Sequence, residues 1–118
     1  MRKRYVLDET FNPIEVNDNS STEIKSVVLV EDIFHDGGKL TTRFMGYAIE
    51  PSSNDERRKG LPPLFFETVL KLPGQRKVCL ERYRSYKDAL YGHKVNHERQ
   101  LTLYGGENEL KSDPDSRS

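Results

Sequence analysis

The sequence predicts an α+β domain, an antiparallel sheet of about four main strands with one C-terminal helix. Runs of β-branched and aromatic residues alternate with turns as far as residue 83, and one segment with helical spacing follows. The length of 118 residues suits a single domain. We therefore expect one domain over residues 1–104 and a disordered acidic tail over residues 105–118, which contain few apolar residues.

Two hairpins are expected in the first half of the chain. Short strands at residues 5–7 and 14–16 flank an Asn-Pro turn, and the residue before proline disfavours helix. Residues 26–34 are rich in β-branched side chains and predict the next strand. The Asp-Gly and Gly-Gly pairs that follow are typical of a tight reversal, which leads into a returning strand over residues 40–49.

A third hairpin is expected in the second half, with strands over residues 64–72 and 77–83. The Pro-Gly pair between them predicts a turn. If residues 73–76 form a four-residue loop, Glu67 lies directly opposite Arg82. A cross-strand ion pair of this kind contributes about 0.2–1 kcal/mol.

One helix is expected after the last strand. Ser85 and Asp88 resemble a capping box, and the helix should run to about Leu103 and end at the glycine pair that follows. Gly92 lies beside the apolar stripe, which suggests close approach of the helix to a strand. The stripe expected to pack on the sheet consists of Tyr86, Ala89, Leu90, His93, His97 and Leu101.

Composition excludes several classes of protein. Lys plus Arg and Asp plus Glu both number 19, so a uniformly basic nucleic-acid binder is excluded. Cys79 is the single cysteine, which excludes an intrachain disulfide and a cysteine-built zinc site. The basic N-terminus lacks the apolar stretch of an export signal, and no apolar run approaches the length of about 20 residues that spans a bilayer. We expect a cytoplasmic protein.

The net charge conceals an uneven distribution along the chain. Residues 1–56 carry a formal charge of −5, residues 57–104 carry +7 and residues 105–118 carry −2. The basic segment also contains several tyrosines. Arginine offers a planar fork for phosphate and tyrosine offers a stacking face, so this segment is typical of a site for a nucleotide or another aromatic anion.

The candidate ligand-binding residues come from this basic segment. Residues 51–63 form a polar, proline-containing loop of a length that is often functional. The candidates are Arg57, Arg58, Arg82, Tyr83, Arg84 and Tyr86. An equally strong alternative is that these cations pair with the acidic first half, within the monomer or across a dimer. Binding of duplex nucleic acid is disfavoured because no reading motif is visible.

Metal binding and catalysis receive less support from the sequence. His93 and His97 stand one helical turn apart, but a third metal ligand is missing, so we expect no metal and no cofactor. Glu67, Glu81 and the histidines could form an acid–base pair, but carboxylates beside arginines on strands are more often charge partners. We therefore expect no catalytic residues.

Two segments resemble a known group of proteins. Residues 60–69 and 81–93 are similar to a widespread family of small bacteriophage proteins that share a Gly-Pro-Pro-Leu-Leu-Phe-Glu-Thr-Met strand, an Arg-Tyr strand end and an Ala-x-x-Gly-His helix. Phe11 stands where the opening motif of these proteins has glycine. The resemblance implies a phage accessory protein in the host cytoplasm, with no activity to transfer. Size and build are also similar to those of Thoeris anti-defence proteins, which sequester nucleotide signals.

Three functions follow as hypotheses. The first is a non-enzymatic, homo-oligomeric binding protein that captures a phosphate-bearing small molecule, such as a nucleotide-derived signal of anti-phage defence. The second is a protein-interaction module that inhibits or remodels a host enzyme through a sheet edge or a helix surface. The third is a hydrolytic enzyme that would use Glu67 or His93.

Overall fold

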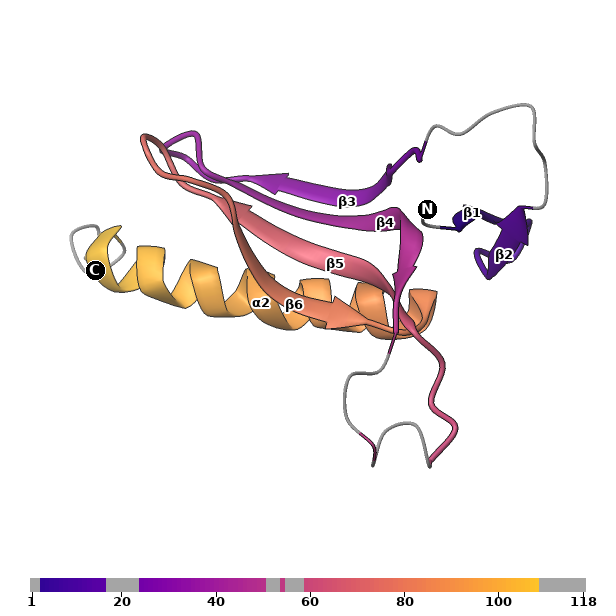
Figure 1. Ribbon diagram of the computed structural model, residues 1–118. Helices are drawn as coiled ribbons and strands as arrows, with labels where there is room; N and C mark the ends of the chain where they lie inside the picture. The colour runs from indigo at the N-terminus through magenta and orange to yellow at the C-terminus, as the bar shows by residue number, and fades with distance from the viewer. Residues whose placement is uncertain (1–2, 17–23, 51–53, 55–58, 109–118) are drawn as a thin grey trace.

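The computed structural model of the protein describes residues 3–16, 24–50, 54 and 59–108 (Figure 1). It confirms the α+β prediction: a four-stranded antiparallel sheet in the order β3-β4-β5-β6 and a two-stranded sheet accompany a C-terminal helix. The elements are β1 (Arg4–Leu7), β2 (Pro13–Val16), β3 (Val27–Ile33), β4 (Lys39–Ile49), β5 (Leu64–Lys71), β6 (Val78–Tyr83) and α2 (Tyr86–Asn108).

The three predicted hairpins are present, and local chemistry explains their turns. Between β3 and β4, Gly37 adopts a φ of 92°, a backbone conformation that glycine reaches without a steric penalty. The carboxylate of Asp36 accepts a hydrogen bond of 2.8 Å from the amide of Gly38. These interactions hold the chain in the tight reversal that the Asp-Gly pair predicts.

The β5–β6 hairpin pairs Glu67 with Arg82 as predicted, but its turn and its register near the turn differ from the prediction. Leu70 pairs with Val78, which leaves a longer turn than the expected four-residue loop. A register shift then follows, because Val69 pairs with Cys79 and Thr68 pairs with Glu81. The shift leaves one extra residue on β6, a β-bulge, and this bulge restores the predicted pairing further along the hairpin.

Helix α2 begins as the sequence predicts and ends later. The hydroxyl of Ser85 accepts a hydrogen bond of 3.1 Å from the amide of Asp88, which confirms the N-terminal cap. The predicted end near Leu103 is wrong, because α2 continues to Asn108 through the glycine pair. Each glycine weakens a helix by about 1 kcal/mol but does not end it. Residues 109–118 lie outside the described residues.

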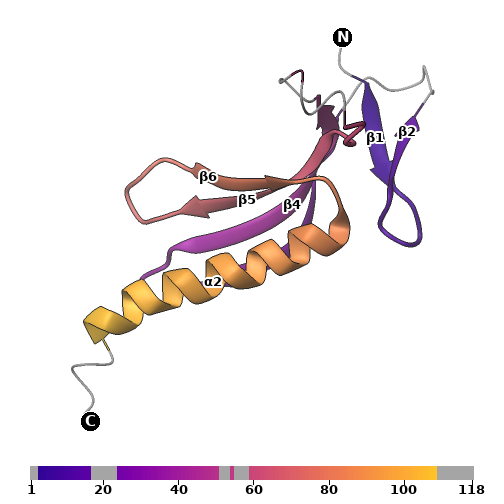
Figure 2. The same cartoon turned by 90° about the horizontal axis from the view of Figure 1, so that it is seen from below.

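Helix α2 covers one face of the four-stranded sheet (Figure 2). Side chains alternate between the two faces along each strand, and Leu40, Thr42 and Phe44 of β4 are buried beneath the helix. Gly92 is where α2 comes closest, since a Cβ at this position would overlap the Tyr83 ring. The buried core consists of Phe44, Phe65, Phe66, Tyr83 and Ala89.

The buried stripe of α2 differs in part from the predicted one. Ala89 and His93 are buried as expected, but Leu101 is 47% exposed. Asn96, which the sequence did not single out, is buried instead. Continuing the three- and four-residue spacing from Asn96 leads to Gln100, which is half-buried, and the stripe therefore passes Leu101 by.

The opposite face of the sheet is only partly covered. At one end of this face the β1–β2 hairpin packs on the sheet, and the Tyr5 ring meets the Phe65 ring edge-on with centroids 4.9 Å apart. Among the described elements, none packs on the remainder of this face (Figure 2). We call the remainder the open face.

Candidate functional site

The structure brings three of the six predicted ligand-binding residues together. Arg82, Tyr83 and Arg84 line a groove of about 490 Å³ between β6 and α2, which we call the β6–α2 groove. Tyr86 is not part of this groove, and its ring stacks on Phe11 with centroids 4.4 Å apart. The remaining two predicted residues, Arg57 and Arg58, lie outside the described residues.

Both arginines on this strand end already have protein partners. Nε of Arg82 lies 3.7 Å from Oε1 of Glu67, and Nε of Arg84 donates a hydrogen bond of 2.9 Å to the carbonyl of Pro62. The groove also contains Glu81 and Asp88 beside its three arginines, so its charges nearly cancel. This arrangement resembles the alternative in which cations pair within the protein.

Tyr83 belongs to the core. Only 6% of this residue is exposed to solvent, and its hydroxyl oxygen lies 2.8 Å from that of Thr68. Burial raises the pKa of Tyr83 to about 12, so the hydroxyl keeps its proton and remains a hydrogen-bond donor. The ring packs under Gly92 and offers little surface on which a base could stack.

The residues considered for hydrolysis lie on opposite faces of the sheet. Glu67 is on the open face, where Arg43 donates a hydrogen bond of 2.7 Å to it. His93 lies on the helix-covered face, 2.7 Å from Asp32 and 2.7 Å from Thr42. The sheet separates the two groups, so this geometry does not support an acid–base pair between them.

The histidine pair has a carboxylate neighbour that the sequence did not reveal. Oδ2 of Asp32 lies 2.7 Å from Nε2 of His93 and 3.9 Å from Nδ1 of His97. The shorter contact is a hydrogen bond. No group of three or more His, Cys, Asp or Glu side chains within the described residues is arranged to hold a metal ion.

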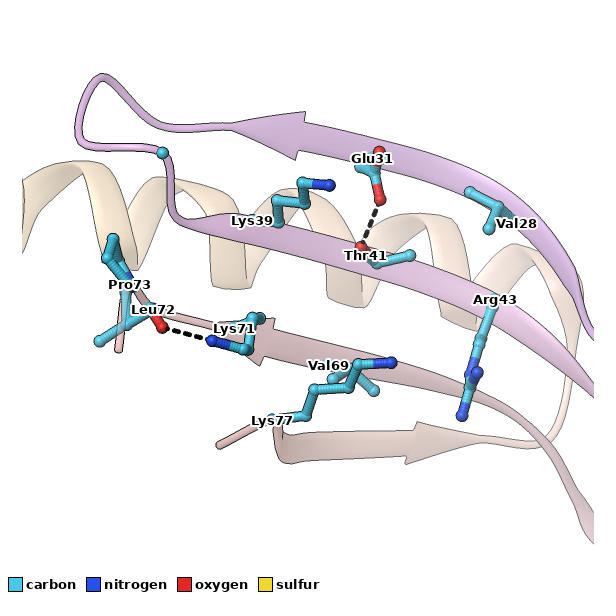
Figure 3. A pocket seen from close by; sticks show the side chains of 11 residues that line it. Val28, Glu31, Lys39, Thr41, Arg43, Val69, Lys71, Leu72, Pro73 and Lys77 are labelled. Atoms are coloured by element: carbon cyan, nitrogen blue, oxygen red, sulfur yellow. Dashed lines mark hydrogen bonds between the residues drawn. The ribbon is translucent and has the colours of Figure 1, made fainter. Parts of the chain in front are cut away.

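A second groove lies on the open face of the sheet, with a volume of about 320 Å³. Figure 3 shows it with α2 behind the sheet. Cationic residues predominate, since four Lys or Arg side chains are accompanied by one carboxylate. We call it the sheet-face groove, and it is lined by Val28, Glu31, Gly37, Lys39, Thr41, Arg43, Val69, Lys71, Leu72, Pro73 and Lys77.

Strand alternation explains why these residues meet. Lys39, Thr41 and Arg43 occupy every second position of β4 and therefore point to one side of the sheet. Antiparallel pairing places Lys71 opposite Lys39 on β5, so two lysines lie side by side on the open face. Lys77 reaches the same groove from the end of the β5–β6 turn (Figure 3).

Two of the four cations have no partner within the described residues. Arg43 donates a hydrogen bond to Glu67, and Nζ of Lys71 donates a hydrogen bond of 2.9 Å to the carbonyl of Leu72. The side chains of Lys39 and Lys77 make no hydrogen bond or ion pair with any part of the chain that the structure describes. These two ammonium groups are therefore available to an anion.

None of the six residues predicted from the sequence is among the four cations of this groove, Lys39, Arg43, Lys71 and Lys77. Dividing the chain into linear segments assigned Lys39 and Arg43 to the acidic first half, whereas the sheet joins them to cations of the second half. The signal that would have found them is the period-two spacing of Lys39, Thr41 and Arg43 within a predicted strand.

No protein-family model, curated protein or solved structure matches this chain. Among the helices in the described part of the chain, none combines the length and apolar character needed to cross a membrane.

Proposed function

We propose that this chain is a non-enzymatic binding protein that captures a phosphate-bearing small molecule, a nucleotide derivative, in the sheet-face groove. One observation carries the proposal: Lys39, Arg43, Lys71 and Lys77 converge on a groove that contains a single carboxylate, Glu31. Glu31 is itself engaged, because it accepts a hydrogen bond of 2.8 Å from Thr41. The groove therefore favours an anion over a cation.

The groove offers separate surfaces for the two parts of a nucleotide. Lys39 and Lys77 supply ammonium groups for phosphate, and charge-assisted hydrogen bonds of this kind are among the stronger polar contacts. Val69 and Pro73 supply apolar surface on which a base can rest. A volume of about 320 Å³ lies within the range of small-molecule sites, which begins at roughly 300 Å³.

The wider setting of the proposal comes from the sequence resemblance. It supports a phage accessory protein that acts in the host cytoplasm, with a nucleotide-derived signal of host defence as its ligand. We also propose that the protein is a homo-oligomer. Exposed apolar side chains on the edge strand β3 support association, since Val28 is 57% exposed and Ile33 is 65% exposed.

A thermal-unfolding screen tests the binding function. The full chain is heated with mononucleotides, cyclic dinucleotides and ADP-ribose, and pyrophosphate serves as a probe without a base. A ligand at a hundredfold excess over its dissociation constant stabilises a protein by about 2.7 kcal/mol, which raises the unfolding temperature measurably. Stabilisation by a nucleotide beyond that by pyrophosphate is the expected result. If none of the panel raises the unfolding temperature, the proposal fails.

A second candidate function is a protein-interaction module that inhibits or remodels a host enzyme. The observation that favours it is the exposure of the other edge strand, β6, in which every residue before Tyr83 is exposed. A pull-down from host lysate separates the two functions. A stoichiometric protein partner that survives mutation of Lys39 and Lys77 supports the interaction module and counts against ligand capture.

A further inference from the structure

A chain of hydrogen bonds crosses the buried contact between α2 and the sheet. Nε2 of His93 lies 2.7 Å from Oδ2 of Asp32, and Nδ1 of His93 lies 2.7 Å from the hydroxyl of Thr42. The Thr42 hydroxyl bonds to that of Thr68, which lies 2.8 Å from the hydroxyl of Tyr83. His93 is 4% exposed and both threonines are fully buried. We call these five residues the polar chain.

The donors and acceptors of the polar chain can be assigned from one end. A carboxylate oxygen only accepts, so Nε2 of His93 carries a hydrogen that it donates to Asp32. In a neutral imidazole Nδ1 then accepts, and Thr42 must donate to it. Thr42 has no second hydrogen, so Thr68 donates to Thr42. By the same argument Tyr83 donates to Thr68.

The other end of the polar chain lies at the β6–α2 groove. Nδ2 of Asn96 lies 3.3 Å from the Tyr83 oxygen and 3.2 Å from Oε1 of Glu81. The amide orientation is fixed because Oδ1 of Asn96 accepts a hydrogen bond of 3.3 Å from Arg99. The same Asn96 nitrogen contacts both groups, so the Glu81 carboxylate lies beside the Tyr83 hydroxyl. An acceptor is therefore in place if that hydroxyl turns away from Thr68.

We propose that the polar chain couples protonation of His93 to the direction in which Tyr83 donates its hydrogen bond. A proton from solvent forms an N–H bond at Nδ1 of His93, and no covalent bond in the protein breaks. Nδ1 then donates to Thr42. The hydroxyls of Thr42 and Thr68 must each reverse, and Tyr83 donates to Glu81. Every member of the polar chain has a partner in both states.

Titratable and charged groups lie at both ends of the polar chain. Within the part of the chain that the structure describes, the titratable groups beside His93 are Asp32 of β3, whose side chain is 37% exposed, and His97 of α2. The residues that β4 and β5 contribute to the polar chain, Thr42 and Thr68, carry hydroxyls and no charge. At the Tyr83 end, β6 contributes Glu81 and α2 contributes Arg99. A change at one end reaches the other through buried hydroxyls.

The experiment is a pH titration of His93 by nitrogen-15 NMR on the full chain. We expect the neutral form to carry its hydrogen on Nε2. A neutral form with the hydrogen on Nδ1 would overturn the assignment and the proposal with it. Tyr83→Phe removes the hydroxyl that receives the Thr68 hydrogen in the protonated state, which leaves a buried donor without a partner. The midpoint of the His93 titration should therefore fall by about half to one pH unit.

Two matched pairs of variants keep the result interpretable. Tyr91→Phe removes a hydroxyl in the same groove from a residue that is 70% exposed, and it should leave the midpoint unchanged. Thr68→Val interrupts the polar chain in the middle and should lower the midpoint, whereas Thr68→Ser keeps the hydroxyl and should restore it. The Thr68 pair also serves if Tyr83→Phe does not fold. Midpoints that agree across all of these variants contradict the coupling.

Discussion

Gly92 of α2 lies directly against the ring of Tyr83 on β6, with no space for a side chain between them. A Cβ at position 92 would overlap the ring, and the hydroxyl that anchors the ring to Thr68 keeps it from moving aside. Gly92→Ala should therefore destabilise the protein. Overpacking costs about 1–3 kcal/mol, which exceeds the gain of about 1 kcal/mol in helix propensity. Urea unfolding measures the difference.

A second background isolates the steric cause. In Tyr83→Leu the ring is absent, so adding Gly92→Ala should leave the free energy of unfolding unchanged or raise it. A loss of equal size in both backgrounds would show that the Tyr83 ring is not the obstacle.

Phe11 adopts a φ of 65°, which is unfavourable for a residue with a side chain. The turn is held by the carboxylate of Asp8, which accepts hydrogen bonds from the amide of Asn12 and from the hydroxyl and amide of Thr10, and these bonds lower the pKa of Asp8. Phe11→Ala loses the stacking on Tyr86 and keeps the strain. Phe11→Gly loses the stacking and relieves the strain, so it should be about 1 kcal/mol more stable than Phe11→Ala. Equal stability of the two variants in urea would contradict this account.

Tyr83 should make the protein sensitive to alkaline pH. Burial raises its pKa in the folded protein from 10.0 to about 12. The folded state therefore holds a proton that the unfolded chain releases, and the contribution to stability is complete below the unfolded value and lost as pH rises through the folded value. Free energies of unfolding at several pH values in this window should fall more steeply for the natural chain than for Tyr83→Phe. Parallel curves would count against the buried hydroxyl.

Glu67 is the carboxylate that holds two arginines on the open face. Its side chain is 6% exposed, and both Arg43 and Arg82 contact it. Glu67→Gln leaves these cations without a charge partner, and the free energy of unfolding should fall by about 1–3 kcal/mol. Glu31→Gln, on the same face but exposed, should change it by less than about 0.5 kcal/mol. Equal effects of the two variants would refute the structural role of Glu67.

Local sequence signals were sufficient to predict most of the fold. Residues adjacent in sequence determine the turn at Gly37 and the cap at Ser85. The close approach at Gly92 depends on the absence of a side chain in glycine. The β-bulge on β6 was not predictable, because it arises from the pairing of two strands. The same holds for the burial of Asn96, whose polar partners come from β6 as well as α2.

The candidate site could be predicted only in part. The sequence drew attention to cations in the second half of the chain, to which Lys71 and Lys77 belong, but none of the six predicted residues lines the sheet-face groove. The sequence predicts that the ring of Tyr83 stacks on a ligand, but the side chain lies between β6 and α2 and is buried in the core. Lys39 and Arg43 join the groove through their pairing with β5, which a division of charge along the chain does not reveal.

The most direct test of anion capture is isothermal titration calorimetry with the nucleotide that most stabilises the protein in the thermal screen. We predict that Lys39→Gln/Lys77→Gln weakens binding at least about tenfold, because each lost charge-assisted contact contributes more than a neutral one. The control Lys87→Gln/Lys94→Gln removes two exposed lysines of α2 and should bind as the natural chain does. Unchanged affinity in the first variant, or a greater loss in Arg84→Gln/Arg99→Gln, would contradict the sheet-face groove as the binding site.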